Sequence, residues 1–73
     1  MKKILIVGAT GFIGTNLTRY LIEKNYKIRV FIRNKDKFHL KNKEIEIFVG
    51  DLENKSDLDN ALKNIDIAFY LAH

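Results

Sequence analysis

Three glycines at intervals of three, Gly8, Gly11 and Gly14, directly follow the apolar run Lys3–Val7. That run is short and rich in β-branched residues, which is typical of a strand buried on both faces of a sheet. From Gly11 to about Lys24 the apolar period changes to that of an amphipathic helix. Glycines between a strand and a helix allow a tight turn, close approach of a pyrophosphate, and close packing of helix on strand. The stretch therefore predicts a strand, a phosphate-binding turn and a helix.

The start of this helix is the expected phosphate site. The amides of Phe12 and Ile13 have no partner inside a helix that begins here, and the helix dipole favours a negative charge beside them. Thr10 could add a hydroxyl donor. A Walker A loop needs lysine after its last glycine, whereas Thr15 and Asn16 stand here, which argues against a nucleoside triphosphatase. The spacing G-x-x-G-x-x-G is not the commoner G-x-G-x-x-G, so a purely structural turn stays open beside dinucleotide binding.

Within the first helix, Ile13, Leu17 and Leu21 recur at i, i+4 and i+8 and predict its apolar face. We expect Tyr20 beside them, on the buried side. Asn25 follows the helix, and asparagine tolerates the left-handed conformation in which many helices end. This segment therefore predicts a helix that packs on a sheet and stops at a defined residue.

The rest of the chain reads as strand, loop, strand, helix and strand. The segment 34–44 is mostly polar and predicts a loop or one helical turn. Ser56 is the predicted N-cap of the second helix, and Asn64 its predicted end. The apolar face of this helix is predicted at Leu58, Ala61, Leu62 and Ile65. Three further strands, rich in β-branched or aromatic residues, are predicted at 28–32, 45–49 and 66–71.

This order of elements is that of a doubly wound parallel sheet with right-handed crossovers. We therefore expect an α/β fold over residues 1–73, the truncated N-terminal half of a Rossmann domain, with four strands in the order 3-2-1-4 and two main helices. The fourth strand would form an uncovered edge. Such an edge can pair with another strand, so it is a candidate surface for self-association.

The residue that follows the second predicted strand bears on which dinucleotide binds. A site for NAD usually has Asp or Glu about 20 residues after the glycines, to accept from the ribose 2′-hydroxyl, whereas a 2′-phosphate needs a cation. Arg33 stands at about that distance, with Lys35 and Lys37 close behind. A guanidinium suits a phosphate monoester, so the sequence predicts NADP rather than NAD, with NAD as the alternative cofactor. The competing interpretation of Arg33 is a surface arginine that leaves a strand.

Composition excludes several other classes of function. The chain carries 13 Lys and Arg against 9 Asp and Glu, a formal charge of +4, but the cations are dispersed and surround no nucleic-acid motif. We therefore expect no nucleic-acid partner. No apolar run approaches the roughly 20 residues that span a bilayer, and the glycines interrupt any signal-peptide core, so we expect no membrane partner. The sequence has no cysteine, which is compatible with a cytoplasmic location.

Four motifs together carry a resemblance to a known superfamily: "GATGFIG", Arg33 after the second strand, "GDL" at 50–52, and "YLAH" at 70–73. Along essentially its whole length the chain is similar to the N-terminal half-domain of extended and atypical short-chain dehydrogenase/reductases, in the NmrA-like and NAD-dependent epimerase/dehydratase group. The resemblance implies that Asp51 contacts the adenine amino group, that Leu52 flanks the ring, and that Ala72 lies near the ribose or nicotinamide. Their structural interpretations are a loop carboxylate, a core leucine and a small residue at a strand end.

Members of this superfamily use a Tyr-x-x-x-Lys pair beyond the fourth strand, where lysine lowers the tyrosine pKa for proton exchange during hydride transfer. Tyr20 and Lys24 satisfy the bare spacing, but they lie in the first helix, and we interpret the match as coincidence. We assign no catalytic residue and no metal ligand. The resemblance implies the cofactor-binding module of a reductase or sugar-nucleotide epimerase/dehydratase. The alternative is a non-catalytic NADP-sensing regulator that binds a protein partner.

Overall fold

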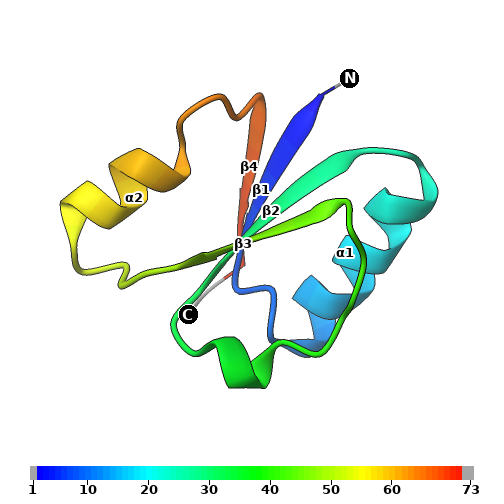
Figure 1. The fold of residues 1–73 in the computed structure, drawn as a ribbon, viewed down its shortest axis with the longest axis horizontal. Coiled ribbons are helices and arrows are strands. Elements are labelled where there is room, and N and C mark those ends of the chain that lie inside the picture. The colour runs from blue at the N-terminus through cyan, green and yellow to red at the C-terminus, as the bar shows by residue number, and fades with distance from the viewer. Residues whose placement is uncertain (1, 72–73) are drawn as a thin grey trace.

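The computed structural model describes residues 2–71 and has one parallel four-stranded sheet in the order β3-β2-β1-β4. Figure 1 views this sheet edge-on, with α1 on one side and α2 on the other. Each strand is within one residue of its prediction, and a single 3-10 turn, η1, occupies the predicted loop. The elements are β1 (Lys3–Val7), α1 (Phe12–Glu23), β2 (Lys27–Ile32), η1 (Lys35–Lys37), β3 (Ile45–Val49), α2 (Lys55–Ala61) and β4 (Ile67–Tyr70).

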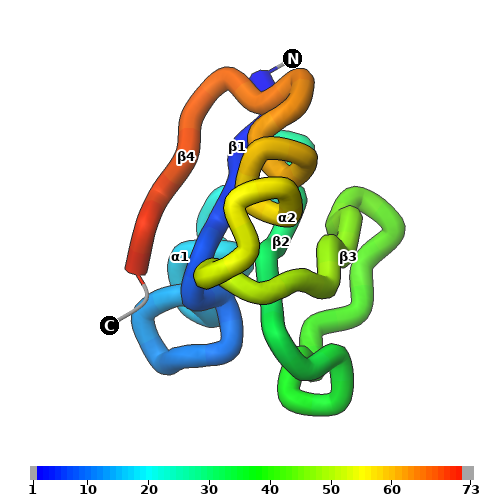
Figure 2. Tube along the Cα trace, turned by 90° about the vertical axis from the view of Figure 1, so that its left-hand side faces the viewer, coloured from blue at the N-terminus to red at the C-terminus, as the bar shows by residue number. Residues whose placement is uncertain are grey.

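The core has two layers because successive side chains of the central strands point to opposite faces of the sheet. On the α1 face, alternate residues of β1 and β2 pack with Leu21 in one cluster. On the α2 face, Leu5, Val7 and Phe31 pack with Ala61 in the other. Figure 2 shows the strands side by side, with β4 and β3 at the two edges. The central strands are therefore buried on both faces, as the apolar run Lys3–Val7 predicted.

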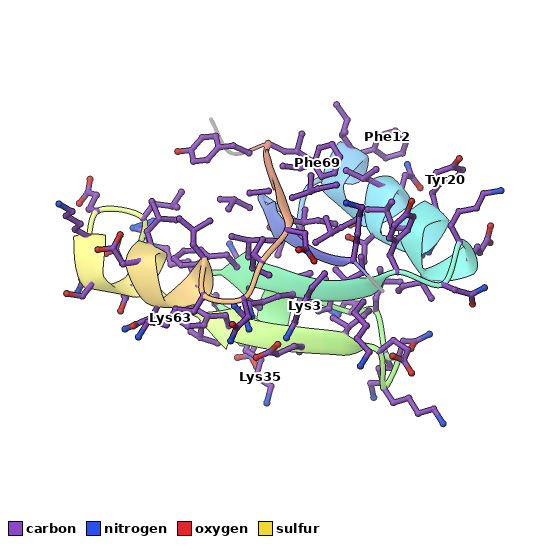
Figure 3. All side chains as sticks on the ribbon, turned by 90° about the horizontal axis from the view of Figure 1, so that it is seen from above. Lys3, Phe12, Tyr20, Lys35, Lys63 and Phe69 are labelled. Atoms are coloured by element: carbon purple, nitrogen blue, oxygen red, sulfur yellow. The ribbon has the colours of Figure 1, made fainter. Side chains whose placement is uncertain are left out.

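The face that α1 presents to the sheet differs from the prediction. Its buried residues are Gly14, Thr18 and Leu21, whereas Ile13 is 68% exposed and Tyr20 is 55% exposed. The prediction that both lie on the buried side is wrong, because two small residues bring the helix backbone close to the sheet and turn the larger side chains outward. Figure 3 shows Tyr20 projecting from the outer side of α1.

The ends of both helices follow local chemistry. Asn25 has a φ of 66°, the predicted left-handed conformation. Asn64 is also left-handed, with a φ of 63°, but α2 ends three residues before this predicted end, at Ala61. The N-cap of α2 is Asn54, whose side chain accepts from the amide of Asp57, so the prediction of Ser56 is wrong. The helix consequently begins one residue before Ser56, at Lys55. Leu62, predicted on its apolar face, lies after the last helical residue and is 41% exposed.

A buried arginine holds α2 to the sheet near the amino ends of the strands. Arg29 of β2 is 7% exposed, and its Nη1 donates to the carbonyl oxygens of Ala61 at 2.6 Å and Lys63 at 2.8 Å. Its Nε lies 3.1 Å from Glu46 Oε1, an ion pair whose N–H is not well aligned with the oxygen. Glu46 also pairs with Lys3 at 2.6 Å. The hydrogen bond from Lys3 and, less strongly, the neighbouring arginine lower the pKa of Glu46.

Candidate functional site

The four strands are parallel, so the loops that follow them meet at one end of the sheet. A cavity of about 410 Å³ opens there. Crevices at the carboxyl ends of parallel strands, where the strand order reverses, are the usual ligand sites of such sheets. Five predicted site residues lie in its wall, namely Gly8, Thr10, Arg33, Asp51 and Leu52.

The three glycines separate into different physical roles. Gly8 has a φ of 96°, which permits the tight turn out of β1. A Cβ on Gly14 would lie 2.2 Å from the Gly8 carbonyl oxygen and 2.8 Å from Ala9 Cα, so this glycine allows α1 to pack against the end of β1. A Cβ on Gly11 would meet only the Gly8 oxygen, at an ordinary 3.7 Å. The fold therefore requires two of the glycines and leaves the third, which is exposed, free for another purpose.

The first turn of α1 offers backbone donors that have no partner among residues 2–71. Gly11 is its N-cap and supplies no side-chain acceptor, and the turn contains no acidic residue. The first intrahelical bond is donated by Thr15 to the Gly11 oxygen, so the amides of Phe12, Ile13 and Gly14 precede the hydrogen-bonded ladder. The side chain of Phe12 is 84% exposed and projects away from the sheet (Figure 3). The predicted amides therefore lie at a helix end that can receive an anion.

Three threonines surround this turn, and only one faces the cavity. Thr15 Oγ1 donates to the Ala9 oxygen at 3.1 Å, and Thr18 Oγ1 donates to the Gly14 oxygen at 2.7 Å. The Thr15 hydroxyl thus ties α1 to the turn, and the Thr18 hydroxyl is used within α1 itself. Thr10 is exposed and lines the cavity, so the structure places the predicted hydroxyl beside it.

Arg33 lies directly after β2, with an exposed side chain on the cavity wall. Within residues 2–71, it forms no ion pair with a carboxylate. The turn η1 follows, and the Asn34 side chain caps it by accepting from the Asp36 amide at 3.0 Å. Lys35 and Lys37 belong to η1 and do not line the cavity. Of the predicted cations, Arg33 alone thus reaches the cavity wall.

The loop after β3 brings Asp51 and Leu52 to the same cavity. Asp51 Oδ1 accepts from the Glu53 amide at 2.9 Å, a local turn that fixes the carboxylate. Leu52 is half-buried and packs against the core cluster on the α2 face. Ala72, the remaining predicted residue, lies outside the described residues.

Sequence reasoning missed two aromatic residues of the cavity wall. Phe31 of β2 lines the cavity and stacks on Phe48, with ring centroids 5.5 Å apart and planes at 16°. Tyr70 ends β4, lines the same cavity and is 64% exposed. Tyr70 pairs in register with Val7, and both residues line the cavity at the carboxyl ends of their strands. Aligning the predicted ends of the first and fourth strands would therefore have identified Tyr70.

The Tyr20 and Lys24 pair lies away from this cavity. The Lys24 ammonium sits 5.5 Å from the centroid of the exposed Tyr20 ring, and neither residue lines the cavity. Within the described part of the chain, no three His, Cys, Asp or Glu residues gather where they could hold a metal ion. No helix within residues 2–71 is long and apolar enough to cross a membrane.

Comparison with known proteins places this geometry in a family. The model of the NmrA-like family matches residues 1–73. The chain belongs to this family. Its NmrA-like sequence lies within the wider group of extended short-chain dehydrogenase/reductases, as its relatives show.

The chain is 34% identical to sterol-4-alpha-carboxylate 3-dehydrogenase, decarboxylating, of Mus musculus over 71 residues, 97% of this chain and 19% of that protein. It is 37% identical to UDP-glucose 4-epimerase of Rickettsia bellii over an alignment of 81 positions including gaps, which covers 97% of this chain and 24% of that protein. A Rossmann-fold NAD(P)-binding family protein from Shigella flexneri superposes with a TM-score of 0.91 at 31% identity, covering 99% of this chain and 38% of that one. The chain thus spans about a fifth to two fifths of the relatives that it matches.

Proposed function

We propose that this NmrA-like chain binds NADP(H) in preference to NAD(H), as the nucleotide-binding half of a reductase or sugar-nucleotide epimerase/dehydratase. The observation that carries the proposal is the shared cavity, whose wall includes both the glycine turn at Gly8 and Arg33, which forms no ion pair with any carboxylate of residues 2–71. The α1 end would take the pyrophosphate, and Arg33 would take the 2′-phosphate. Two relatives, from mouse and Rickettsia bellii, are named as a dehydrogenase and an epimerase.

The residues present fit such a cofactor. A Cβ on Gly11 would meet only the Gly8 oxygen, at 3.7 Å, so the fold does not require glycine there, and its absent side chain suits a pyrophosphate that approaches the backbone closely. Asp51 and Leu52, which line the same cavity, would receive the adenine, as their match to the family motif implies. When bound, the nicotinamide supplies hydride chemistry. The chain's own part is to bind and orient the nucleotide, and we assign no catalytic residue within these 73 residues. Consistent with its lack of cysteine, we place this function in the cytoplasm.

Titration calorimetry with NADPH and NADH tests the preference. We expect wild type to bind NADPH at least tenfold more tightly, and Arg33→Ala to bring the two affinities within about threefold. Arg19→Ala is the matched control, because Arg19 is also exposed but lies on α1, outside the cavity wall. Equal affinities in wild type, or an unchanged ratio in Arg33→Ala, would overturn the assignment of Arg33. A non-catalytic sensor would use the same site. Oxidation of NADPH by the full-length protein when reducible substrates are added would indicate an enzyme, and no oxidation would indicate the sensor.

A further inference from the structure

The loop after β3 is held by a helix that does not itself line the cavity. The amide of Asp51 donates to Asp57 Oδ2, on α2, at 3.0 Å. The backbone of Asp51 makes a second bond, in which the Asn54 amide donates to the Asp51 carbonyl oxygen at 3.0 Å. Asp51 Oδ1 is used by the Glu53 amide. Among the described residues, Asp51 Oδ2 accepts no hydrogen bond, so it is the oxygen available to a ligand.

Asp57 is well placed to fix this loop. It is half-buried in the first turn of α2, and its own amide donates to Asn54 Oδ1 at 3.2 Å. A Cβ on Gly50 would lie 3.2 Å from Asp57 Cβ and 3.0 Å from a Phe31 ring carbon, so Gly50 fits tightly between the helix and the aromatic floor of the cavity. The Gly50 amide donates to the Ile32 oxygen at 2.9 Å, which ties the loop's start to β2.

We propose that Asp57 is a positioning residue, which holds the Asp51 amide so that the free Asp51 oxygen faces the adenine end of the cavity. This inference rests on the proposed nucleotide site, whose adenine wall it concerns. Without an acceptor at residue 57, the Asp51 amide loses its partner and the loop gains alternative conformations. Only a fraction of molecules then presents Asp51 correctly, and the apparent affinity falls by that fraction. The pyrophosphate end, at α1, does not depend on this contact.

Calorimetry with two probes separates the two ends of the site. Adenosine 2′,5′-bisphosphate probes the adenine and Arg33 end, and inorganic pyrophosphate probes the α1 end. We expect Asp57→Ala to weaken the adenosine ligand about tenfold and to leave pyrophosphate unchanged. Asp57→Asn keeps an oxygen acceptor and should bind both probes within twofold of wild type. Asp59→Ala removes an exposed carboxylate from the same helix and should match wild type throughout.

Several results would overturn the inference. The inference is wrong if Asp57→Ala binds the adenosine ligand as tightly as Asp59→Ala does. It is also wrong if Asp57→Ala loses affinity for both probes equally, or if Asp57→Asn loses as much affinity for the adenosine ligand as Asp57→Ala. If Asp57→Ala does not fold, Asp57→Glu keeps the charge and displaces the acceptor by one methylene. It should weaken only the adenosine ligand several-fold, and wild-type affinity for that ligand would overturn the inference.

Failure of the proposed function has a different signature. Wild type would then bind neither probe, and the positioning contact is read from amide hydrogen exchange instead. The Asp51 amide should exchange at least tenfold faster in Asp57→Ala than in Asp59→Ala. Equal exchange in the two variants would show that Asp57 does not hold the loop, whatever the ligand.

Discussion

Alanine substitutions at Gly14 and Gly11 should separate stability from binding: the first should destabilise the fold, and the second should weaken nucleotide binding. In Gly14→Ala, the new Cβ would lie 2.2 Å from the Gly8 oxygen, about 1 Å inside an ordinary contact, and its three nearest neighbours are all backbone atoms. No side chain can rotate away, so α1 must move off β1. Overpacking of this kind costs about 1–3 kcal/mol and sometimes more, and backbone contacts place it at the upper end. A domain of this size has a total stability of about 4–11 kcal/mol, so the loss is a large fraction.

Gly11→Ala should leave stability nearly unchanged. Gly11 has φ −76° and ψ 171°, which any L-residue adopts, and its Cβ would make an ordinary 3.7 Å contact. We expect a change within about 1 kcal/mol. In the proposed site the pyrophosphate approaches the backbone at Gly11 closely, so an added methyl group should lower the affinity for NADPH and for pyrophosphate at least tenfold. Gly8→Ala is intermediate, because a φ of 96° costs an alanine about 1–2 kcal/mol.

The assay pairs urea denaturation, followed by circular dichroism, with calorimetric titration of each variant. The chain has three tyrosines and no tryptophan, and Tyr70 lines the cavity, so quenching of tyrosine fluorescence gives an independent binding signal. The reasoning is refuted if Gly11→Ala binds as wild type does, because the turn would then not receive a phosphate. It is equally refuted if Gly11→Ala is destabilised as much as Gly14→Ala, because the fold would then require all three glycines.

Three further predictions concern the rest of the fold. Arg29→Met should lower the free energy of unfolding by about 2–4 kcal/mol in urea denaturation, because the carbonyl of Ala61, at the end of α2, and that of Lys63, just beyond it, lose a charged donor; a loss below 1 kcal/mol would contradict this. The lowered pKa of Glu46 makes its pairing with Lys3 stabilising above the ordinary carboxyl pKa of about 4.3, and this contribution is lost as pH falls through the depressed pKa. Between pH 5 and pH 3, the urea midpoint of Glu46→Gln should accordingly fall less than that of wild type. An equal fall of the two midpoints would count against the pairing. We also propose that the exposed β4 edge self-associates, so sedimentation equilibrium should show a concentration-dependent mass that Phe69→Lys abolishes, and a monomer at every concentration would argue against it.

The sequence predicted best where a local rule sufficed. The glycine spacing and the apolar run before it determined the turn, the strand and the helix, and Asn25 adopts the expected left-handed backbone after α1. Tyr20 and Ile13 were placed wrongly, because periodicity identifies an apolar stripe but not which side of it the sheet will contact. Here small residues, Gly14 and Thr18, decide the matter by allowing close approach.

Contacts between distant segments could not be predicted from the sequence. Arg29 stands in an apolar strand, where a charged residue normally indicates an exposed position. Its partners, the carbonyls of Ala61 and Lys63, lie more than thirty residues away and become available only when α2 ends over β2. Asp57 likewise resembles any acidic residue in the first turn of a helix. Its bond to the Asp51 amide exists because β3 and α2 meet at Gly50.

These two contacts lie at opposite ends of the same short helix, and together they couple the site to the far end of the sheet. Four residues of α2, about 6 Å of helix, separate Asp57, which holds the loop, from Ala61, whose oxygen accepts from Arg29. A helix this short is stable only through its tertiary contacts, so releasing its C-terminal end frees its N-terminal end as well. Arg29→Met should therefore weaken the adenosine ligand as well as the fold. Glu46→Gln, which leaves the carbonyl contacts intact, should spare that affinity. A variant that lost stability at Arg29 but kept full affinity for the nucleotide would show instead that the loop is held without α2.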